Sequence, residues 1–293
     1  MRSNSTQSRT NPSMRMAIAA MGLAALALPA SAHRIEKHFA VEGKPVVTIH
    51  NSNGRIQVKS WNKPEVMVVG DHGSSSVEVE TEQAGSRIEV NTRVLNSSAR
   101  GSDLQADYQI TVPEETQLTV RTDMGSIVVE SVHGDLRFET LAANVSLQDT
   151  GGVIFVRTGD GSIVCARCDG RLDAISVSGN VQLLQPIMDQ ITVHTTAGNI
   201  LFDGDFLRHG TYNLKSDTGS TDVHFGSASS FDLTARSEHG TVVNEANLQP
   251  DKHGKKLNLP RGTNALLGTV GSGNAKVELY SFSGTIKILR REQ

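Results

Sequence analysis

Aromatic residues are scarce in this chain, which has one Trp, three Tyr and eight Phe among its 293 residues. It has instead 27 Gly and many Ser, Thr, Val and Ile residues, which favour short strands closed by tight turns. The composition therefore indicates an all-β fold and argues against a large helical core.

An excess of positive charge is also absent. The formal net charge is -3, with 28 Lys and Arg against 31 Asp and Glu. A mildly acidic chain is a poor nucleic-acid binder, so nucleic acid is not an expected partner. No apolar run after residue 32 approaches the length of a membrane helix, so we expect no transmembrane anchor in the mature chain.

The first 32 residues have the pattern of a signal peptide. Three Arg and no acidic residue precede an apolar run from Met16 to Leu28, and residues 30–32 read Ala-Ser-Ala. A charged segment, a short apolar segment and an A-x-A site predict cleavage after Ala32. The mature chain would begin at His33 with a formal charge of -6, because three Arg are lost from the 28 basic residues. The residue directly after the cleavage site is His33 and not Cys, which argues against a lipid-modified N-terminus. A periplasmic or extracellular location is expected.

Glycine recurs on a nine-residue grid between Thr122 and Leu184, with Ala143 in the one empty position. Apolar residues follow two and four residues later, as Ile127 and Val129 do, and this alternation indicates a half-buried strand. Each grid glycine is predicted to form a corner, because glycine takes positive φ without steric cost. These glycines are Gly125, Gly134, Gly152, Gly161, Gly170 and Gly179.

One nine-residue unit is too short for a full solenoid turn, so two units are expected to form one coil of about 18 residues. Gly198, Gly219 and Gly240 are evenly spaced at a slightly larger interval, which predicts successive, longer coils. The predicted fold is an all-β β-solenoid with about 18–21 residues per coil and an N-terminal β-cap.

Three regions follow from these patterns. Residues 1–32 form the signal peptide, residues 33–121 the N-terminal β-cap, and residues 122–293 the solenoid repeats, which continue from the cap in one domain. Trp61 is expected to be the large core residue of the cap.

The chain resembles a family of exported bacterial repeat proteins that are labelled "putative adhesins", LiaG-like and otherwise of unknown function. The resemblance is carried by IHNSNGRIQVKSWNKPEV at residues 49–66, YQITVP at residues 108–113 and the ladder that opens with RTDMGSI at residues 121–127. It implies a β-solenoid in the envelope or outside the cell, and it supplies no catalytic residue or cofactor.

Cys165 and Cys168 form the only cysteine pair. They could form a local disulfide in an oxidising compartment, remain as buried thiols, or take part in redox or metal chemistry. No cofactor or metal site is expected, because the ten His residues are scattered and form no ligand cluster. A short basic run is interpreted as a solvated loop, with contact to an anionic envelope polymer or to lipid head groups as the alternative. Its members are Lys252, His253, Lys255, Lys256 and Arg261.

Stacking the units at an interval of about 18 residues tests for an enzyme that cleaves polysaccharide, which would need paired outward carboxylates. No two carboxylates align, and Glu139 is expected to pair with Arg157. Asp203, Asp205 and Asp217 could still converge from longer loops, so a carbohydrate-active enzyme stays open as an alternative.

Two outward features are candidate contacts. Phe155 is expected between Arg137 and Asp173 on one face, as a candidate surface contact. A polar column of alternating Ser and Asn, including Asn144 and Asn180, is interpreted as structural support for the corners.

The sequence thus favours a non-enzymatic, exported β-solenoid that acts as an adhesin-like binding or scaffolding protein of the bacterial envelope. Its partner would be an envelope protein or a glycan. A β-helix carbohydrate-active enzyme and a purely structural envelope protein are the alternatives.

Overall fold

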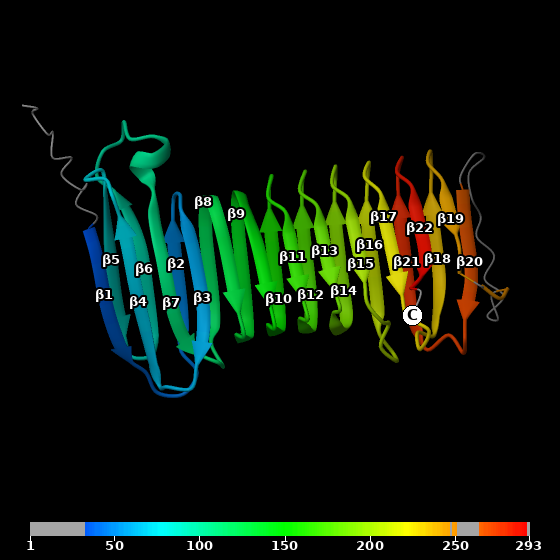
Figure 1. The fold of residues 1–293 in the computed structure, drawn as a ribbon, viewed down its shortest axis with the longest axis horizontal. Helices are drawn as coiled ribbons and strands as arrows, with labels where there is room; N and C mark the ends of the chain where they lie inside the picture. The colour runs from blue at the N-terminus through cyan, green and yellow to red at the C-terminus, as the bar shows by residue number, and fades with distance from the viewer. Residues whose placement is uncertain (1–32, 247, 251–263, 292–293) are drawn as a thin grey trace, which may run out of the picture. The chain divides into compact units, whose positions relative to one another are not determined.

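The computed structural model describes residues 33–246, 248–250 and 264–291. Every described residue belongs to one compact unit. The described residues form 22 strands and one 3-10 helix, η1 (Gly101–Leu104), with no helix long and apolar enough to cross a membrane (Figure 1). The predicted signal peptide and the basic run around Lys252 lie outside the described residues.

The central strands stack in register, and each strand lies beside the strand that is one coil further along the chain. In the parallel pair of β8 and β9, Leu118 lies opposite Leu136, and in that of β10 and β12, Ile154 lies opposite Leu172. These registers confirm the predicted coil length. The strands are β8 (Gln117–Glu130), β9 (His133–Gln148), β10 (Gly151–Thr158), β11 (Ile163–Ala166), β12 (Asp169–Ser176) and β13 (Val181–Leu184).

Each coil contributes one strand to each of two faces. The first face contains the N-terminal halves of β8 and β9, followed by β10 and β12, and the second face contains their C-terminal halves, followed by β11 and β13. Figure 1 shows these strands side by side along the stack. Apolar side chains of both faces point inward, so the alternation seen in the sequence becomes a continuous core.

The next coils are longer, as predicted. Val181 lies opposite Ile200, and Ile200 lies opposite Thr221, so the interval between facing residues grows along the stack. One extra residue, Asp189 of β14, enters where the register shifts opposite Gly170 and Arg171 of β12. The strands concerned are β14 (Ile187–Thr195), β15 (Ile200–Asp203), β16 (Thr211–Ser216) and β17 (Thr221–Phe225).

The last coil of the chain is inserted between two earlier ones. Lys215 of β16 lies opposite Tyr280, and Tyr280 lies opposite Arg236, so β21 (Ala275–Ser281) separates β16 from β18 (Phe231–Ser237). On the second face, β22 (Ile286–Arg290) likewise separates β17 from β19 (Val242–Asn244). The red strands β21 and β22 are visible between the yellow and orange ones in Figure 1. The prediction that Gly240 follows Gly219 is therefore wrong, because Gly284 lies between them.

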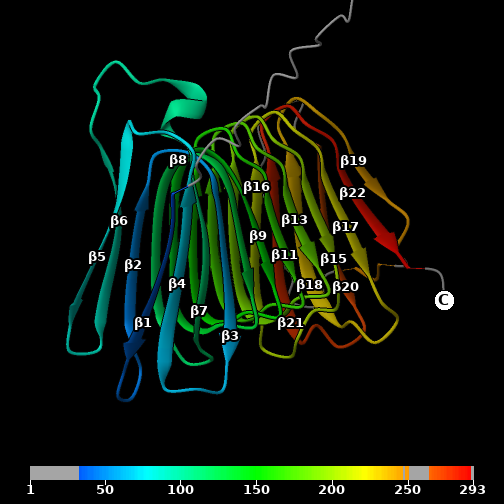
Figure 2. The same cartoon turned by 60° about the vertical axis from the view of Figure 1, so that its left-hand side comes forward.

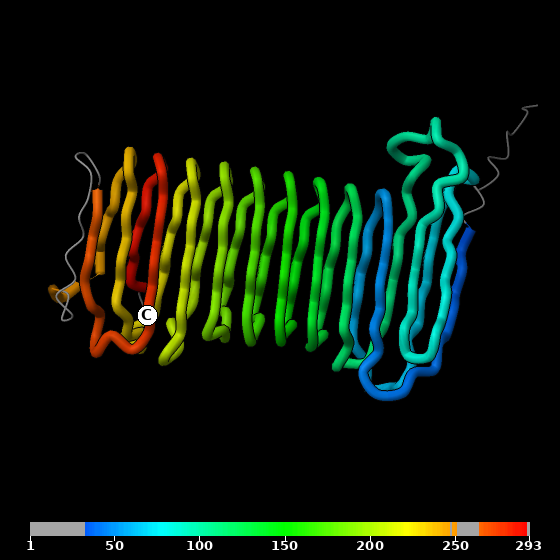
Figure 3. Tube along the Cα trace, turned by 180° about the vertical axis from the view of Figure 1, so that it is seen from behind, coloured from blue at the N-terminus to red at the C-terminus, as the bar shows by residue number. Residues whose placement is uncertain are grey.

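The N-terminal end has the same kind of insertion. β2 (Val46–Asn51) pairs in parallel with both β6 (Arg87–Val94) and β8, while β3 (Arg55–Trp61) pairs in parallel with both β7 (Ala106–Pro113) and β8. Figure 3 shows this blue coil between green segments. Residues before the predicted boundary at 121 and 122 thus lie in the same stack as the repeats, and the division into cap and repeats stays a prediction.

Antiparallel strands cover both ends of the stack. At the N-terminal end β5 (Val77–Ala84) pairs with β6, while β4 (Glu65–His72) pairs with β7 and with β1 (His33–Ala40). Figure 2 shows the β5 and β6 hairpin beside the η1 segment. At the other end β20 (Asn264–Val270) pairs with β18. These strands cover parallel edges that would otherwise expose unpaired backbone groups.

The core is aliphatic along the regular coils and aromatic where the coils lengthen. Ile127, Val145, Ile163 and Val181 form one fully buried column. Beyond it Phe202, Phe206, Tyr212, Phe225 and Phe231 pack ring against ring, with centroids 4.6–5.8 Å apart. The expected core role of Trp61 is wrong, because its indole is only half-buried and donates to the Glu65 carbonyl.

Close approach of the preceding coil's backbone excludes a side chain at both kinds of corner, and positive φ is a second requirement at only one kind. Gly152 and Gly170 have φ of 101° and 84°, which an L side chain rarely adopts. Gly161 and Gly179 do not have positive φ, but a Cβ there would overlap the carbonyl oxygen of the preceding coil's corner. The predicted reason, positive φ, is therefore wrong at these two corners, where close approach of the backbones excludes a side chain.

A column of buried hydroxyls supports this second kind of corner. Three residues before the corner, a Ser or Thr oxygen accepts the hydrogen bond of the corner N–H, as between Thr158 and Gly161 at 2.9 Å. The Ser216 hydroxyl accepts from Gly219 N–H at 2.9 Å and donates to the Gly198 carbonyl of the preceding coil at 2.8 Å. The column continues through the inserted coil, and its members are Thr140, Thr158, Ser176, Thr195, Ser216, Ser281 and Ser237.

The Asn side chains next to the corners also bond between coils. Asn144 Oδ1 accepts from Ser162 N–H at 2.9 Å, and Asn180 Oδ1 accepts from Asn199 N–H at 2.8 Å. These bonds agree with the structural interpretation of the polar column.

Replacing Ser216 by alanine should lower the free energy of unfolding by about 1–3 kcal/mol, because it removes the hydrogen bonds to the half-buried Gly219 N–H and the buried Gly198 carbonyl. Urea denaturation measures this change. Thr192→Ala on β14 is the matched control, since Thr192 is exposed and its hydroxyl has no hydrogen bond among the described residues. Equal stabilities of the two variants would contradict a supporting role for the hydroxyl column.

Candidate binding surface

One row of outward side chains runs across the first face. Each member lies opposite the next in the parallel register, and we call this set the outer row. Strands in a sheet are about 4.8 Å apart, so the nine members span roughly 40 Å. They are, in spatial order, His50, Arg121, Glu139, Arg157, Ile175, His194, Lys215, Tyr280 and Arg236.

Glu139 is the only acidic residue of the outer row. Its Oε2 lies 2.7 Å from Arg121 Nε, and its Oε1 lies 2.8 Å from Arg137 Nε. The hydrogen bonds from Arg121, and then from Arg137, hold the pKa of this carboxyl below its ordinary value. The expected pairing of Glu139 with Arg157 is wrong, although the register places them side by side, because both carboxylate oxygens are already taken.

A groove of about 620 Å³ lies beside this part of the outer row. Gly159 contributes no side chain there, while Leu141 and Val177 on either side are 67% and 56% exposed. Arg157 and His50 also line the groove. The groove therefore combines apolar walls with the guanidinium groups of Arg121 and Arg157 and the carboxylates of Asp123 and Glu139.

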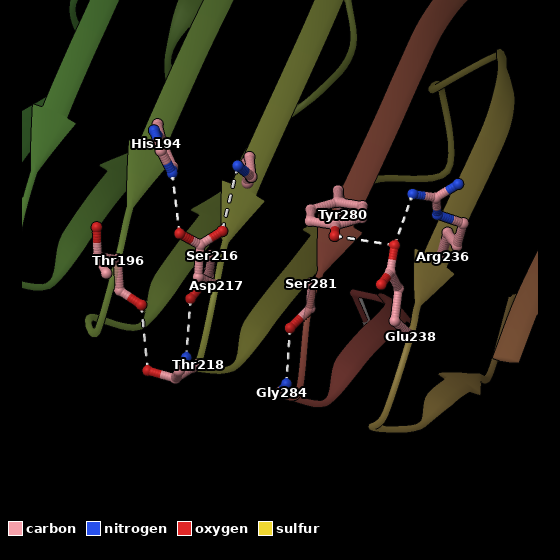
Figure 4. Close-up of polar contacts among 12 residues, drawn as sticks. His194, Thr196, Ser216, Asp217, Thr218, Arg236, Glu238, Tyr280, Ser281 and Gly284 are labelled. Carbon is pink, nitrogen blue, oxygen red and sulfur yellow. Dashed lines mark hydrogen bonds and ion pairs between the residues drawn. The ribbon is translucent and has the colours of Figure 1, made fainter. Parts of the chain in front are cut away.

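The inserted coil creates a second contact cluster. The Tyr280 ring lies between two cations, with Lys215 Nζ 5.4 Å and Arg236 Cζ 5.0 Å from its centroid. The Tyr280 hydroxyl donates to Glu238 Oε1 at 3.1 Å, and Arg236 donates to the same oxygen at 2.9 Å (Figure 4). A hollow of about 390 Å³ lies over Tyr280, Lys215 and Arg236.

Asp217 lies at the end of β16, on the other side of β21 from Glu238 (Figure 4). Its carboxylate is 3.4 Å from His194 Nε2 and 3.2 Å from Lys215 Nζ. Asp217 and Glu238 thus each have a basic partner, Lys215 and Arg236 respectively. Such ion pairs order the side chains and leave neither carboxyl group free to act as a catalytic acid or base.

The sequence matches a known family model over most of its length. The model described as Toastrack DUF4097 matches residues 39–289. The chain belongs to the Toastrack family. The expected fold and the resemblance to an adhesin-like family of unknown function are thereby confirmed. No curated protein matches the chain.

Three solved structures that match this Toastrack chain have little sequence in common with it. A "putative adhesin" from Bacteroides fragilis has 9% identity and a TM-score of 0.46, with 88% of this chain and 97% of that chain covered. One from Parabacteroides merdae has 8% identity, a TM-score of 0.35 and coverage of 88% and 96%. A "putative cell adhesion protein" from Clostridium sporogenes has 9% identity, a TM-score of 0.26 and coverage of 88% and 100%.

Arg137, Phe155 and Asp173 do come together on the first face. Phe155 lies opposite Arg137 on one side and Asp173 on the other, and the Arg137 guanidinium is 4.5 Å from its ring centroid. The Phe155 ring is half-buried, and the Arg137 guanidinium stacks on one side of it. That this set contacts a partner stays a prediction.

Cys165 and Cys168 are joined in a disulfide, and both side chains are fully buried. The disulfide lies inside the second face, away from the groove. In this form the pair has no free thiol for redox or metal chemistry.

Of the acids expected to converge, two do so around a cation. Asp203 and Asp205 lie 3.3 and 3.2 Å from Arg291. Asp217 belongs to the other face. Among the described residues no group of His, Cys, Asp and Glu is arranged to hold a metal ion.

No local sequence pattern indicates the cluster around Tyr280. Tyr280, Arg236 and Glu238 become neighbours only because β21 enters between β16 and β18. The alternation after Gly273 and the corner at Gly284 mark a coil, but nothing local specifies its place in the stack.

Glu139→Gln tests the ion pairs of the outer row. The folded-state pKa of Glu139 lies below its ordinary value of 4.5, so its stabilisation is present above about pH 4.5 and is lost as the pH falls through the folded-state pKa. The variant should be less stable than the wild type at pH 6, by about 1 kcal/mol or less, and the difference should vanish in acid.

Urea denaturation at several pH values between 3 and 6 measures the difference. Glu89→Gln is the control, because Glu89 lies on strand β6, which pairs with β2, and forms no ion pair with any described residue. A difference that grows in acid would contradict the assignment.

Proposed function

We propose that this Toastrack chain is an exported, non-enzymatic binding or scaffolding protein of the bacterial envelope, with an adhesin-like role. The observation that supports this most is the outer row, because eight of its nine strands present basic, acidic or aromatic side chains along one open face, with Ile175 as the exception. The pattern of residues 1–32 supports export. The partner would be an envelope protein or a glycan.

The chemistry of the outer row suits binding better than catalysis. Glu139 of the outer row, and Asp217 and Glu238 beside it, each lie within ion-pair distance of an Arg or Lys side chain. Hydrolysis of a polysaccharide would need one protonated and one free carboxylate on opposite sides of the bond. A repeat stack also offers a long, rigid surface that suits an extended partner.

Fractionation of the tagged full chain in its native host, with crosslinking, tests this proposal. We expect a processed N-terminus at His33 and recovery from the periplasm or medium, with one or more envelope components crosslinked. A double variant, Arg121→Ala with Arg236→Ala, should lose those components, whereas Arg171→Ala, an exposed change outside the outer row, should retain them.

Recovery only from the cytoplasm would contradict the proposal. Turnover of a polysaccharide by the purified protein would favour the enzymatic alternative. An exported protein with no crosslinked component above background would favour a purely structural role.

A further inference from the structure

We infer that the groove beside Arg157 binds a glycan unit that carries both a carboxylate and a small apolar substituent such as an N-acetyl methyl. This inference rests on the proposed binding function and names a ligand class for one part of the outer row. The site consists of Leu141, Gly159 and Val177, with Arg157 at one end, and we call it the Arg157 notch.

The notch is built into the backbone of three successive coils. Asp160 N–H donates to the Leu141 carbonyl at 2.8 Å, and Val177 N–H donates to the Gly159 carbonyl at 3.2 Å, so residues 141, 159 and 177 are neighbours across the sheet. A Cβ on Gly159 would lie 2.6 Å from the Leu141 carbonyl oxygen. The backbone thus requires glycine at the position that leaves the hollow between two exposed aliphatic side chains.

The charge at the notch is positive and unpaired. Within the described part of the chain, the exposed Arg157 guanidinium has no hydrogen-bond or ion-pair partner. Its neighbour Glu139 is occupied by Arg121 and Arg137. Three arginines therefore face one glutamate, with Asp123 the other acid of the groove. A planar guanidinium with free donors binds a carboxylate in a bidentate manner.

The apolar part of the notch is small. Leu141 and Val177 flank a hollow one residue wide, which suits a methyl or acetamido group rather than a large apolar side chain. A carboxylate and such a group on one sugar would occupy both halves of the notch at the same time.

The surroundings favour a glycan over a peptide. Peptides commonly add as a strand to an open sheet edge, but β9, β10 and β12 are paired on both sides here. Beyond Ile175 the outer row continues with side chains that donate hydrogen bonds, namely His194, Lys215, Tyr280 and Arg236. Such groups match the hydroxyls of a sugar chain.

Titration of the mature protein with matched sugars tests the inference. N-acetylmuramic acid has both groups, N-acetylglucosamine lacks the carboxylate, and glucuronic acid lacks the acetamide. We expect N-acetylmuramic acid to bind with a Kd on the order of 1 mM and each of the others about tenfold more weakly, measured by isotope-labelled chemical-shift titration.

Variants separate the two halves of the notch. Arg157→Gln should weaken N-acetylmuramic acid about tenfold and leave N-acetylglucosamine unchanged, because only the carboxylate contact is lost. Val177→Thr keeps the shape and should weaken both acetylated sugars. Arg171→Gln is the control, and unchanged circular dichroism establishes that each variant is folded.

Equal binding of the three sugars, no binding, or no effect of Arg157→Gln would overturn the inference. Tighter binding of a short peptide that ends in Val would also overturn it, because the ligand would then be a peptide carboxylate. If the crosslinked envelope components of the wild-type protein persist while these sugars fail, the inference alone fails. Recovery only from the cytoplasm would instead remove the proposed function.

Discussion

Close approach between the backbones of successive coils is the constraint on which the rest of this structure depends. Parallel strands bring each coil within one strand spacing of the next, and at the corners the backbone itself comes into contact. Gly161 and Gly179 are needed because a Cβ would overlap a carbonyl of the neighbouring coil. The Ser and Thr hydroxyls before these corners bond the corner N–H groups, so tight stacking leaves few buried groups without partners.

This constraint explains how much of the fold the sequence could predict. The nine-residue grid, the buried positions at Ile127 and Val129 and the length of the regular coil follow from local glycine and apolar spacing. The order of the coils does not follow from these local features, because the same corner glycine and preceding hydroxyl recur in coil after coil and specify no particular neighbour. Gly219 could accept either Gly240 or Gly284 as its neighbour, and sequence distance favoured the wrong one.

The same limit applies to the candidate site. Phe155 was placed correctly between Arg137 and Asp173, since all three belong to regular coils. The ion-pair partners of Glu139 were not predicted correctly, because strand register determines which residues are adjacent but not the direction in which a long side chain extends. The contacts of Tyr280 depend on long-range strand order, so no local pattern could show them. The outer row is therefore a property of the assembled stack, to which residues from position 50 to position 280 contribute.

Disulfide trapping tests the inserted coil most directly. Lys215 and Tyr280 are Cα partners on adjacent strands, whereas Arg236 is two strands from Lys215, roughly 10 Å away. A disulfide needs Cα atoms within about 7 Å. Under mild oxidation of the folded protein, Lys215→Cys with Tyr280→Cys should crosslink, and Lys215→Cys with Arg236→Cys should not, as read by peptide mass spectrometry. The reverse result would mean that the coils stack in chain order and would contradict the account.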